Sequence, residues 1–315
     1  MRVEILRLLG DAGFVSGEYI AERLGVSRAA VWKQIKSLRN MGYEIESVKN
    51  KGYRLVSRPD IPIAEEVTIG LGTQVIGKDI YYFKSLPSTN MFAKKLVKDG
   101  VHEGAIVVSD VQLSGRGRKN RNWFSPEGGL WFSVVLYPHI PPERGMLITM
   151  ASSVAIVQGI KEATGLHSVI KWPNDLLING RKVCGILTEF DAEMDRMNYT
   201  VVGIGINVNN QLSEGLHGTA TSLIQETGSC VSRVKLLRSI IKCFDENYCR
   251  LISGDYDFIR KSWFSHVNIV GREILVHGEK TILKGVVSSV DDSGCLILDT
   301  RDGSVRVVSG DLEYL

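Results

Sequence analysis

The chain has 315 residues, of which 44% are hydrophobic and 23% are charged, and its formal net charge is +3. These proportions match ordinary globular domains, which excludes wholesale disorder and fibrous architecture, and the length predicts two or three domains. No apolar run approaches the roughly 18 residues of a membrane span, and the five cysteines have no Cys-x-x-Cys spacing. We therefore expect no disulfide framework and no zinc cage, and a reducing cytoplasm fits this composition.

The charge is divided unevenly along the chain. Residues 1–58 hold 11 Lys and Arg against 6 Asp and Glu, a net charge of +5, whereas the remainder holds 27 against 29, a net charge of −2. A small basic segment ahead of a slightly acidic body indicates that only the first segment meets a polyanion.

Three helix signals fall within the first forty residues. Ser16 is a good N-cap for a helix over residues 17–24, and Ser27 is a good N-cap for the next helix, which ends at Gly42. The turn at Gly25 joins these two helices in a helix-turn-helix pattern. The outward positions of the last helix are basic, as a recognition helix in a major groove requires.

Two strand patterns, at residues 43–48 and 53–56, follow the helices and are joined by a basic turn at 49–52. The hairpin is typical of a wing, so we predict a winged helix-turn-helix DNA-binding domain over residues 1–60. The candidate DNA contacts are Ser27, Arg28, Lys33, Lys36, Arg39 and Lys51. The alternative is a three-helix packing module whose charges are only solvated.

Two prolines within residues 59–62 interrupt every periodicity and predict a domain boundary. Beyond them, apolar strand patterns at 105–108, 131–136 and 201–208 alternate with helical patterns, the clearest at 149–164 and 235–251. This alternation predicts a central sheet with helices, of the α/β or α+β class.

Two segments of the body carry groups suited to a small ligand. Ser88, Thr89 and Asn90 open a helical pattern, where they either cap the helix or hydrogen-bond a urea or amide ring. Gln112 precedes a loop at residues 114–123 that holds two glycines and four cations within seven positions. Such a loop can wrap an anion with its amides and guanidiniums, although a plain surface loop or an RNA-binding tract remains open.

Two further segments fall later in the body. Pro173 fixes a turn that places Lys171, Asn174 and Asp175 at a strand end. A Lys near an Asp suits a nucleotide with its magnesium, and a plain turn with a salt bridge is equally compatible. Lys182 begins an apolar strand, where it either snorkels or faces an anion. Glycines alternate at positions 203 and 205, which leaves one strand face bare for something flat or for close packing.

The last 45 residues show four short strand patterns, at 271–277, 281–290, 295–299 and 304–309, separated by Asp- and Gly-rich turns. This spacing predicts a small β-barrel that docks on the body, because it is too small to bury much apolar surface alone. The six histidines show no metal-ligand spacing, and no nucleophile signature is present.

In this order the motifs resemble one family, the bifunctional biotin–protein ligases that double as biotin operon repressors. The resemblance covers essentially the whole chain. Its most specific parts are the Gly-Arg-Gly-Arg run with Arg121 and Trp123, the Lys-Trp-Pro-Asn-Asp run at 171–175 and the Gly-Arg-Lys run at 180–182 with Gly-Ile-Leu at 185–187. One departure is that Asn120 stands where the family loop has a further glycine, and Asn tolerates positive φ better than most residues.

The resemblance implies a winged helix-turn-helix at 1–60, a catalytic domain at 61–270 and an SH3-like domain at 271–315. The catalytic domain would have a class II synthetase-like mixed sheet with helices on one side. The resemblance assigns Ser88, Thr89, Asn90, Gln112, Gly115, Arg116, Gly117, Arg118 and Lys182 to biotin. It assigns Arg121, Trp123, Lys171, Asn174, Asp175 and Asn207 to ATP, with Mg²⁺ held near Asp175 through the nucleotide.

The implied reaction joins two anions, a carboxylate and a triphosphate. Lys182, Arg116 and Arg118 would be the catalytic cations that neutralise both and stabilise the charge growing on the α-phosphate. A lysine of a biotin carboxyl carrier protein would then take the biotinyl group from the biotinyl-AMP. Operator DNA is the second partner that the resemblance implies, bound by a homodimer that the adenylate promotes.

Three alternatives stay open on sequence grounds. The chain could be a biotin ligase without repressor activity, a lipoate–protein ligase with a similar body, or a ligand-sensing transcription regulator without catalysis. The basic helix and the wing favour DNA binding, and the paired anion-binding motifs favour an enzyme.

Overall fold

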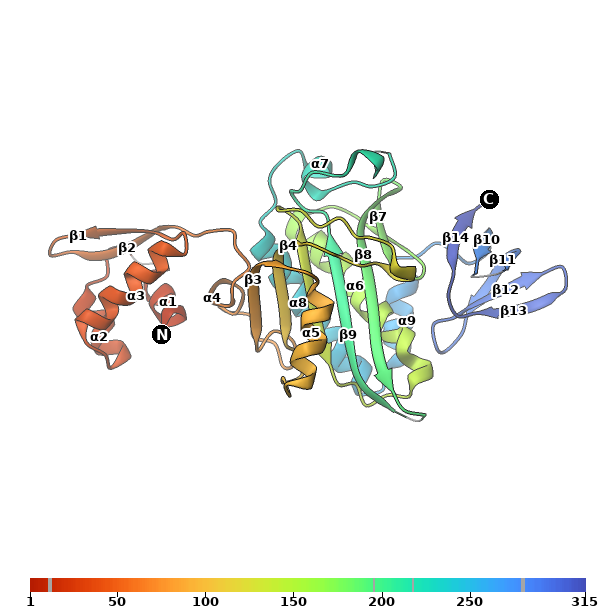
Figure 1. Cartoon of the computed structure of the whole chain (residues 1–315), viewed down its shortest axis with the longest axis horizontal. Helices are drawn as coiled ribbons and strands as arrows, with labels where there is room; N and C mark the ends of the chain where they lie inside the picture. The colour runs from red at the N-terminus through yellow and green to blue at the C-terminus, as the bar shows by residue number, and fades with distance from the viewer. Residues whose placement is uncertain (11–12, 195, 217, 279–280) are drawn as a thin grey trace. The chain divides into compact units, whose positions relative to one another are not determined.

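The computed structural model describes residues 1–10, 13–194, 196–216, 218–278 and 281–315, which divide into a unit of residues 1–70 and a unit of residues 71–315. In the first unit the helices are α1 (Arg2–Leu9), α2 (Gly17–Leu24), α3 (Arg28–Asn40) and α4 (Ala64–Val67), and the hairpin strands are β1 (Glu44–Val48) and β2 (Gly52–Ser57) (Figure 1). The winged helix-turn-helix expected from the sequence is therefore present.

Local side-chain chemistry explains why the helices of this unit begin where they do. Ser16 Oγ accepts a hydrogen bond from the Tyr19 amide, and Ser27 Oγ accepts one from the Ala30 amide, so both predicted N-caps are confirmed. Gly25 ends α2 with a φ of 62°, in the left-handed region that favours glycine.

The first unit also includes α4, which follows the proline-rich segment. Glu66 of α4 is 5% exposed and accepts hydrogen bonds from Tyr43 and Arg58. These contacts hold α4 against the two ends of the hairpin. The predicted boundary at residue 60 therefore falls within the first compact unit, which extends to residue 70. The division into three domains at residues 60 and 270 stays a prediction.

A seven-stranded mixed sheet organises the second unit, in the order β3-β4-β5-β9-β8-β7-β6. Its strands are β3 (Ile80–Leu86), β4 (Ile106–Gln112), β5 (Leu130–Leu136), β6 (Val169–Lys171), β7 (Asp175–Ile178), β8 (Arg181–Ala192) and β9 (Met197–Ile206). The pair β3–β4 is parallel, and the other neighbours are antiparallel.

Helices lie on both faces of this sheet. The helices of the second unit are α5 (Thr89–Lys98), α6 (Gly145–Thr164), α7 (Leu223–Thr227), α8 (Arg233–Ile252) and α9 (Tyr256–Phe264), with short 3-10 turns η1 (Arg118–Asn120), η2 (Pro142–Arg144) and η3 (Glu214–Leu216). Thr188 of β8 contacts Thr149 of α6, whereas Gly203 of β9 faces Asn90 of α5. Thr188 pairs with Val202, so Gly203 points to the opposite side.

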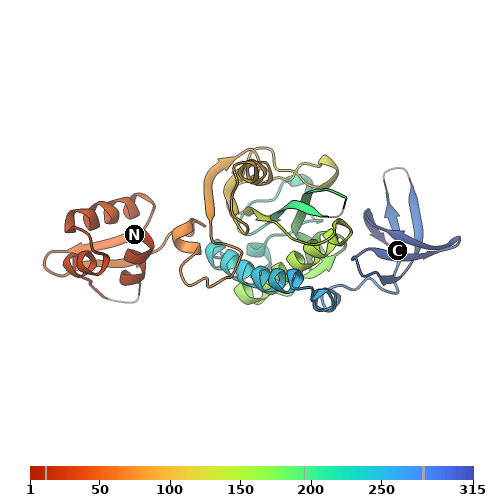
Figure 2. The same ribbon diagram turned by 90° about the horizontal axis from the view of Figure 1, so that it is seen from below.

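The expectation that the helices lie on one side of the central sheet is therefore wrong. Helices α6 and α8 pack together on one face, and α5 lies on the other (Figure 2). The layer under α5 is apolar, with Leu86, Ala93, Val107, Val135 and Val201 buried together. Gly159 of α6 lets α8 approach, because a Cβ there would lie 2.5 Å from Ile240 Cγ1.

The last segment forms a separate antiparallel sheet in the order β13-β12-β11-β10-β14, consistent with the SH3-like domain expected there. Its strands are β10 (Glu273–His277), β11 (Ile282–Val290), β12 (Leu296–Thr300), β13 (Gly303–Val307) and β14 (Asp311–Tyr314). The turn at Gly294 docks on the body, where its carbonyl accepts a hydrogen bond from Trp172 Nε1 at 3.4 Å. The sequence reading did not anticipate β14.

The five cysteines are free thiols. Within the described residues, no helix combines the length and the apolar character that crossing a membrane would need.

Candidate functional site

A cavity of about 920 Å³ opens on the α5 face of the sheet. It is lined by the predicted residues Ser88, Thr89, Asn90, Gln112, Gly115, Arg116, Gly117, Arg118, Arg121, Trp123, Asn174, Asp175, Lys182 and Asn207. These positions come from segments that are far apart in the sequence, so the fold brings together almost all of the predicted set. Lys171 is the exception: it is not part of the lining, and its Nζ lies 5.8 Å from the ring centre of Tyr314.

The end of the cavity at the start of α5 is polar. The backbone amide and the hydroxyl of Thr89 donate to Gln112 Oε1 at 2.9 and 3.1 Å. Ser133 Oγ lies 2.8 Å from Thr89 Oγ1 and 2.6 Å from Asn90 Oδ1. Ser88 occupies the N-cap position, but its hydroxyl makes no capping hydrogen bond. A helix start with an uncommitted hydroxyl and neighbouring amide groups can bind a small ring that both donates and accepts hydrogen bonds.

Asn90 is held by contacts with distant residues that no sequence motif indicates. Its Nδ2 donates to Glu189 Oε2 at 2.7 Å, and Glu189 also pairs with Lys94 of α5. A Cβ on Gly203 would lie 2.1 Å from Asn90 Oδ1, so only glycine leaves room for this amide.

Glycines 185 and 205 form a bare floor on the same face of the sheet. The indole of Trp123 lies against both, and a Cβ on Gly205 would come within 2.4 Å of Trp123 Nε1. The Nε1 atom is buried and has no hydrogen-bond partner among the described residues. Trp131 packs edge-on against this indole, with ring centres 6.5 Å apart. Of the alternate glycines at 203 and 205, Gly205 thus faces a flat group, the Trp123 indole of the Gly/Arg loop, whereas Gly203 faces the Asn90 amide.

Backbone hydrogen bonds fold the Gly/Arg loop back on itself. The amide of Gly117 donates to Arg121 O at 2.8 Å, and the amide of Trp123 donates to Gly115 O at 2.9 Å. Lys119 and Asn120 have φ values of 54° and 56°. Asn is among the residues that tolerate this region, which accounts physically for Asn120 at a position where the family has glycine.

The loop also contacts the C-terminal sheet. Arg118 Nη1 donates to Asn174 Oδ1 at 3.0 Å and to Gly310 O at 3.4 Å. Asp311 pairs with Arg121 and with Lys119. Burial opposes the charged form of Asp311, but these two cations hold its pKa below the usual range. For Arg118 burial is the dominant effect and lowers its pKa, although the nearby carboxylates of Asp311 and Asp175 act to raise it.

Asp311 lines the cavity and was not identified from the sequence. Its pairing with Arg121 joins positions 190 residues apart. No local motif marks it, because an isolated Asp at a strand start has the same appearance as an ordinary turn residue.

Lys182 faces the cavity from the start of β8. Its Nζ lies 2.6 Å from Asp175 Oδ1 and 5.1 Å from the ring centre of Trp123. Asn174 binds the same strand, since its Nδ2 donates to Ile186 O at 2.7 Å. The turn of Pro173 therefore brings a cation, a carboxylate and an amide together beside the loop. Asn207 is 5% exposed and donates to Thr221 O, so it also supports the cavity wall.

A magnesium ion fits this arrangement only as a companion of a nucleotide. Among the described residues, no group of three or more His, Cys, Asp or Glu side chains could hold a metal ion by itself. Asp175 supplies one carboxylate, and Mg²⁺ in phosphate-binding sites is commonly held by one or two carboxylates together with substrate phosphates.

The first unit carries the candidate DNA contacts. Arg28, Lys33 and Lys36 are exposed on α3, and Lys51 is exposed in the turn between β1 and β2. Lys36 Nζ lies 5.5 Å from the ring centre of Trp32, an exposed aromatic on the same helix.

Two of the candidates have structural partners. Arg39 donates to Ile45 O and to Ser47 Oγ of β1, so its guanidinium holds the wing against α3. Ser27 uses its hydroxyl as the N-cap of α3.

The chain matches two protein families. Residues 82–207 match the Biotin/lipoate A/B protein ligase family, and residues 2–54 match an HTH domain family. A solved structure, the biotin protein ligase from Aquifex aeolicus in complex with biotin and ATP, superimposes with a TM-score of 0.65 at 28% sequence identity, covering 76% of this chain and 99% of that one.

Full-length relatives carry both segments. The bifunctional ligase/repressor BirA of Escherichia coli (strain K12) is 27% identical, covering 96% of this chain and 94% of the relative. The bifunctional ligase/repressor BirA of Bacillus subtilis (strain 168) is 40% identical over 99% of this chain and 98% of the relative. The chain therefore belongs to the family of bifunctional biotin–protein ligases and repressors.

Proposed function

We propose that the protein attaches biotin to a lysine of a biotin carboxyl carrier domain, with ATP consumed to AMP and pyrophosphate, and that it represses transcription by binding operator DNA. The observation that carries the enzymatic part is the cavity itself. One end holds neutral hydrogen-bonding groups at the start of α5, and the other holds the cations Arg118 and Lys182 beside Asn174 and Asp175. Biotin has a urea ring at one end and a carboxylate at the other, which matches this polarity.

The first step forms a bond between the biotin carboxylate oxygen and the α-phosphorus of ATP, and pyrophosphate leaves. Ser88, Thr89, Asn90 and Gln112 hold the ureido end. Lys182 lies between the carboxylate and the α-phosphate, where a cation offsets the repulsion between the two anions. Mg²⁺, when bound with the nucleotide near Asp175, supplies charge neutralisation for the leaving pyrophosphate.

In the second step the amine of the acceptor lysine attacks the acyl carbon, and AMP leaves with the bonding pair. The mixed anhydride must survive in water until the acceptor arrives. A Gly/Arg loop that folds over the cavity and contacts the C-terminal sheet can exclude that water.

The decisive experiment is ATP–pyrophosphate exchange by the purified protein with biotin, with lipoate in a parallel reaction. Exchange that depends on biotin supports the proposal, whereas exchange with lipoate alone supports the lipoate ligase alternative. No exchange with either acid would leave the chain as a regulator and would contradict the ligase assignment.

Gly203→Ala should raise the KM for biotin by about 10-fold, because losing one or two hydrogen bonds to the ligand costs about that factor in affinity. The new Cβ would displace the Asn90 amide, 2.1 Å away. The KM for ATP should change little. Gly13→Ala is the control for a neutral glycine-to-alanine change, since nothing lies within 4 Å of an added Cβ there and Gly13 is not among the glycines with a positive φ. Equal changes in both KM values would contradict the placement of biotin at α5.

DNA binding should show a steep salt dependence that reports its phosphate contacts. Lys33→Ala should weaken binding at all sequences and reduce the magnitude of the log K against log salt slope by about 1. Lys98→Ala, outside the first unit, is the control. Fluorescence anisotropy with a labelled operator at several salt concentrations measures the slope. A slope that is flat in the unmutated protein would remove the repressor assignment.

Repression would follow from ligand-promoted dimerisation, because two recognition helices bind two half-sites. Sedimentation of the full chain with and without biotinyl-AMP should show a dimer that increases with ligand. Identical weights in both states would contradict this mode of regulation. We also propose a cytoplasmic location, because five free cysteines without a Cys-x-x-Cys spacing fit a reducing compartment.

A further inference from the structure

Two stems connect the Gly/Arg loop to the sheet. The first stem is the end of β4, Asp110 to Gln112, and the second is the segment 125–130 that leads into β5. The stems meet at the backbone, where the Gln112 amide donates to Ser125 O at 3.1 Å, and at Gln112 Nε2, which donates to Ser125 Oγ at 2.9 Å. Their spacing determines where the loop can close.

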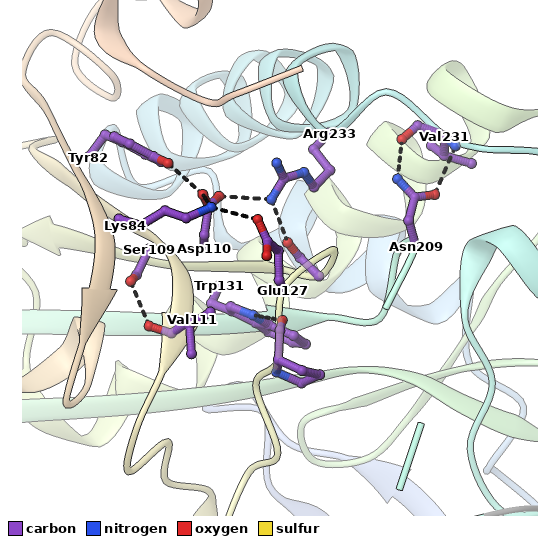
Figure 3. A network of polar contacts seen from close by, with 12 residues as sticks. Tyr82, Lys84, Ser109, Asp110, Val111, Glu127, Trp131, Asn209, Val231 and Arg233 are labelled. Atoms are coloured by element: carbon purple, nitrogen blue, oxygen red, sulfur yellow. Dashed lines mark hydrogen bonds and ion pairs between the residues drawn. The ribbon is translucent and has the colours of Figure 1, made fainter. Parts of the chain in front are cut away.

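Beyond this meeting point, a polar network on the α8 side connects the same two stems. Figure 3 shows Asp110 between Tyr82 and Lys84 on one side and Arg233 on the other. Asp110 is 2% exposed, and its Oδ1 lies 2.9 Å from Arg233 Nη1. Its Oδ2 accepts from Tyr82 Oη at 2.5 Å and from Lys84 Nζ at 3.2 Å.

Both cations of this network bridge the first stem to the second. Lys84 Nζ also lies 2.5 Å from Glu127 Oε1, and Arg233 Nη1 also donates to Gly129 O at 3.4 Å. Each cation therefore holds Asp110 of the first stem and one residue of the second. A change in either stem changes the geometry of both bridges.

The second stem is connected to the cavity through a chain of contacts. Trp131 Nε1 donates to Pro126 O at 3.0 Å, and the Trp131 ring packs edge-on against Trp123. Trp123 lies on the glycine floor next to Lys182. A fixed stem therefore defines where the loop's indole lies relative to the reacting groups.

We infer that Lys84 and its partner Glu127 are positioning residues, which set the spacing of the two loop stems so that the closed loop retains the acyl-adenylate. The inference rests on the proposed ligase function. Lys84 and Glu127 are 69% and 66% exposed, and an exposed ion pair contributes little to global stability. A purely structural role therefore predicts almost no effect of removing Lys84, whereas a positioning role predicts faster loss of the intermediate.

The experiment measures release of labelled biotinyl-AMP from the full-length protein into an excess of unlabelled biotinyl-AMP. Lys84→Met and Glu127→Gln should each speed release about 5-fold, which is near the upper limit expected for an exposed pair. The double variant should release no faster than either single variant, because both changes remove the same bridge. Lys84→Arg should restore slow release. The rate of pyrophosphate exchange at saturating biotin and ATP should stay within about 2-fold of the unmutated protein.

Lys284→Met is the matched control, since Lys284 forms a similarly exposed ion pair with Glu273 in the C-terminal sheet. Release at the unmutated rate in Lys84→Met, or an additive effect in the double variant, would overturn the inference while leaving the ligase function intact. An unmutated protein that forms no acyl-adenylate from biotin would instead overturn the proposed function, and with it this inference.

Discussion

Lys182→Ala should lower the rate of acyl-adenylate formation by about 100-fold or more, which corresponds to about 2.7 kcal/mol of lost transition-state stabilisation. The Lys182 ammonium lies 2.6 Å from Asp175 Oδ1. Its removal takes away the cation between the carboxylate and the phosphate, and it also leaves the Asp175 carboxylate uncompensated where two further anions must bind. Both effects act against the first step.

The measurement is kcat/KM for biotin-dependent pyrophosphate exchange. Arg181→Met is the matched control, because Arg181 is the preceding cation on β8 but pairs with Glu226 and does not line the cavity. Exchange should fall strongly only for Lys182→Ala. A loss of less than about 3-fold would contradict the role of Lys182 in charge stabilisation.

The first unit was the most predictable part of the fold because its signals are local. Ser16, Gly25 and Ser27 each act within three or four residues of their own position, and the structure places helix starts and ends at them. The wing was likewise predicted from two strand patterns and a basic turn. What the sequence could not show is that Arg39, a predicted DNA contact, donates from α3 to Ile45 O of the hairpin.

The cavity was predictable where its residues form short motifs and not where single residues meet across the sheet. The Gly/Arg loop and the segment around Pro173 are recognisable because several polar residues are consecutive. Asp311, Glu189 and Ser133 reach the same cavity residues from strands distant in sequence, and each resembles an ordinary strand residue. Lys171 is assigned to ATP because it lies in the same motif as Asn174 and Asp175. In the structure, however, β6 directs its ammonium towards the ring of Tyr314.

The layering of the body has a similar explanation. The sequence pattern of α5 gave its apolar face but not which side of the sheet that face covers. The alternation of side chains along β9 shows which face α5 covers only when the register with β8 is known. In that register Thr188 pairs with Val202, so Thr188 and Gly203 point to opposite faces of the sheet. Side-chain size then follows from the layer: glycine lies under the ligand side and larger apolar residues lie under α6.

Arg118→Gly should allow the acyl-adenylate to escape at least about 10-fold faster, because a hydrogen bond to a charged donor is worth about 1.5 kcal/mol or more and two are removed. Arg118 ties the loop to Asn174 at 3.0 Å and to Gly310 O of the C-terminal segment at 3.4 Å. Glycine also frees the backbone, so the closed loop loses more conformational entropy than before. The adenylate should still form, since Lys182 and Asp175 are unchanged.

The escaping mixed anhydride should then label lysines of a bystander such as serum albumin, measured by streptavidin blotting against the unmutated protein. Arg301→Gly removes an exposed arginine from the turn between β12 and β13, away from the cavity lining, and should label no more than the unmutated protein. Bystander labelling that stays at the unmutated level, with exchange activity retained, would show that the loop does not depend on Arg118 for closure. Increased labelling with Arg118→Gly and with Lys84→Met would instead show that the tip and the stem of the loop take part in the same closure, because both variants leave Lys182 and Asp175 in place and release opposite ends of the loop.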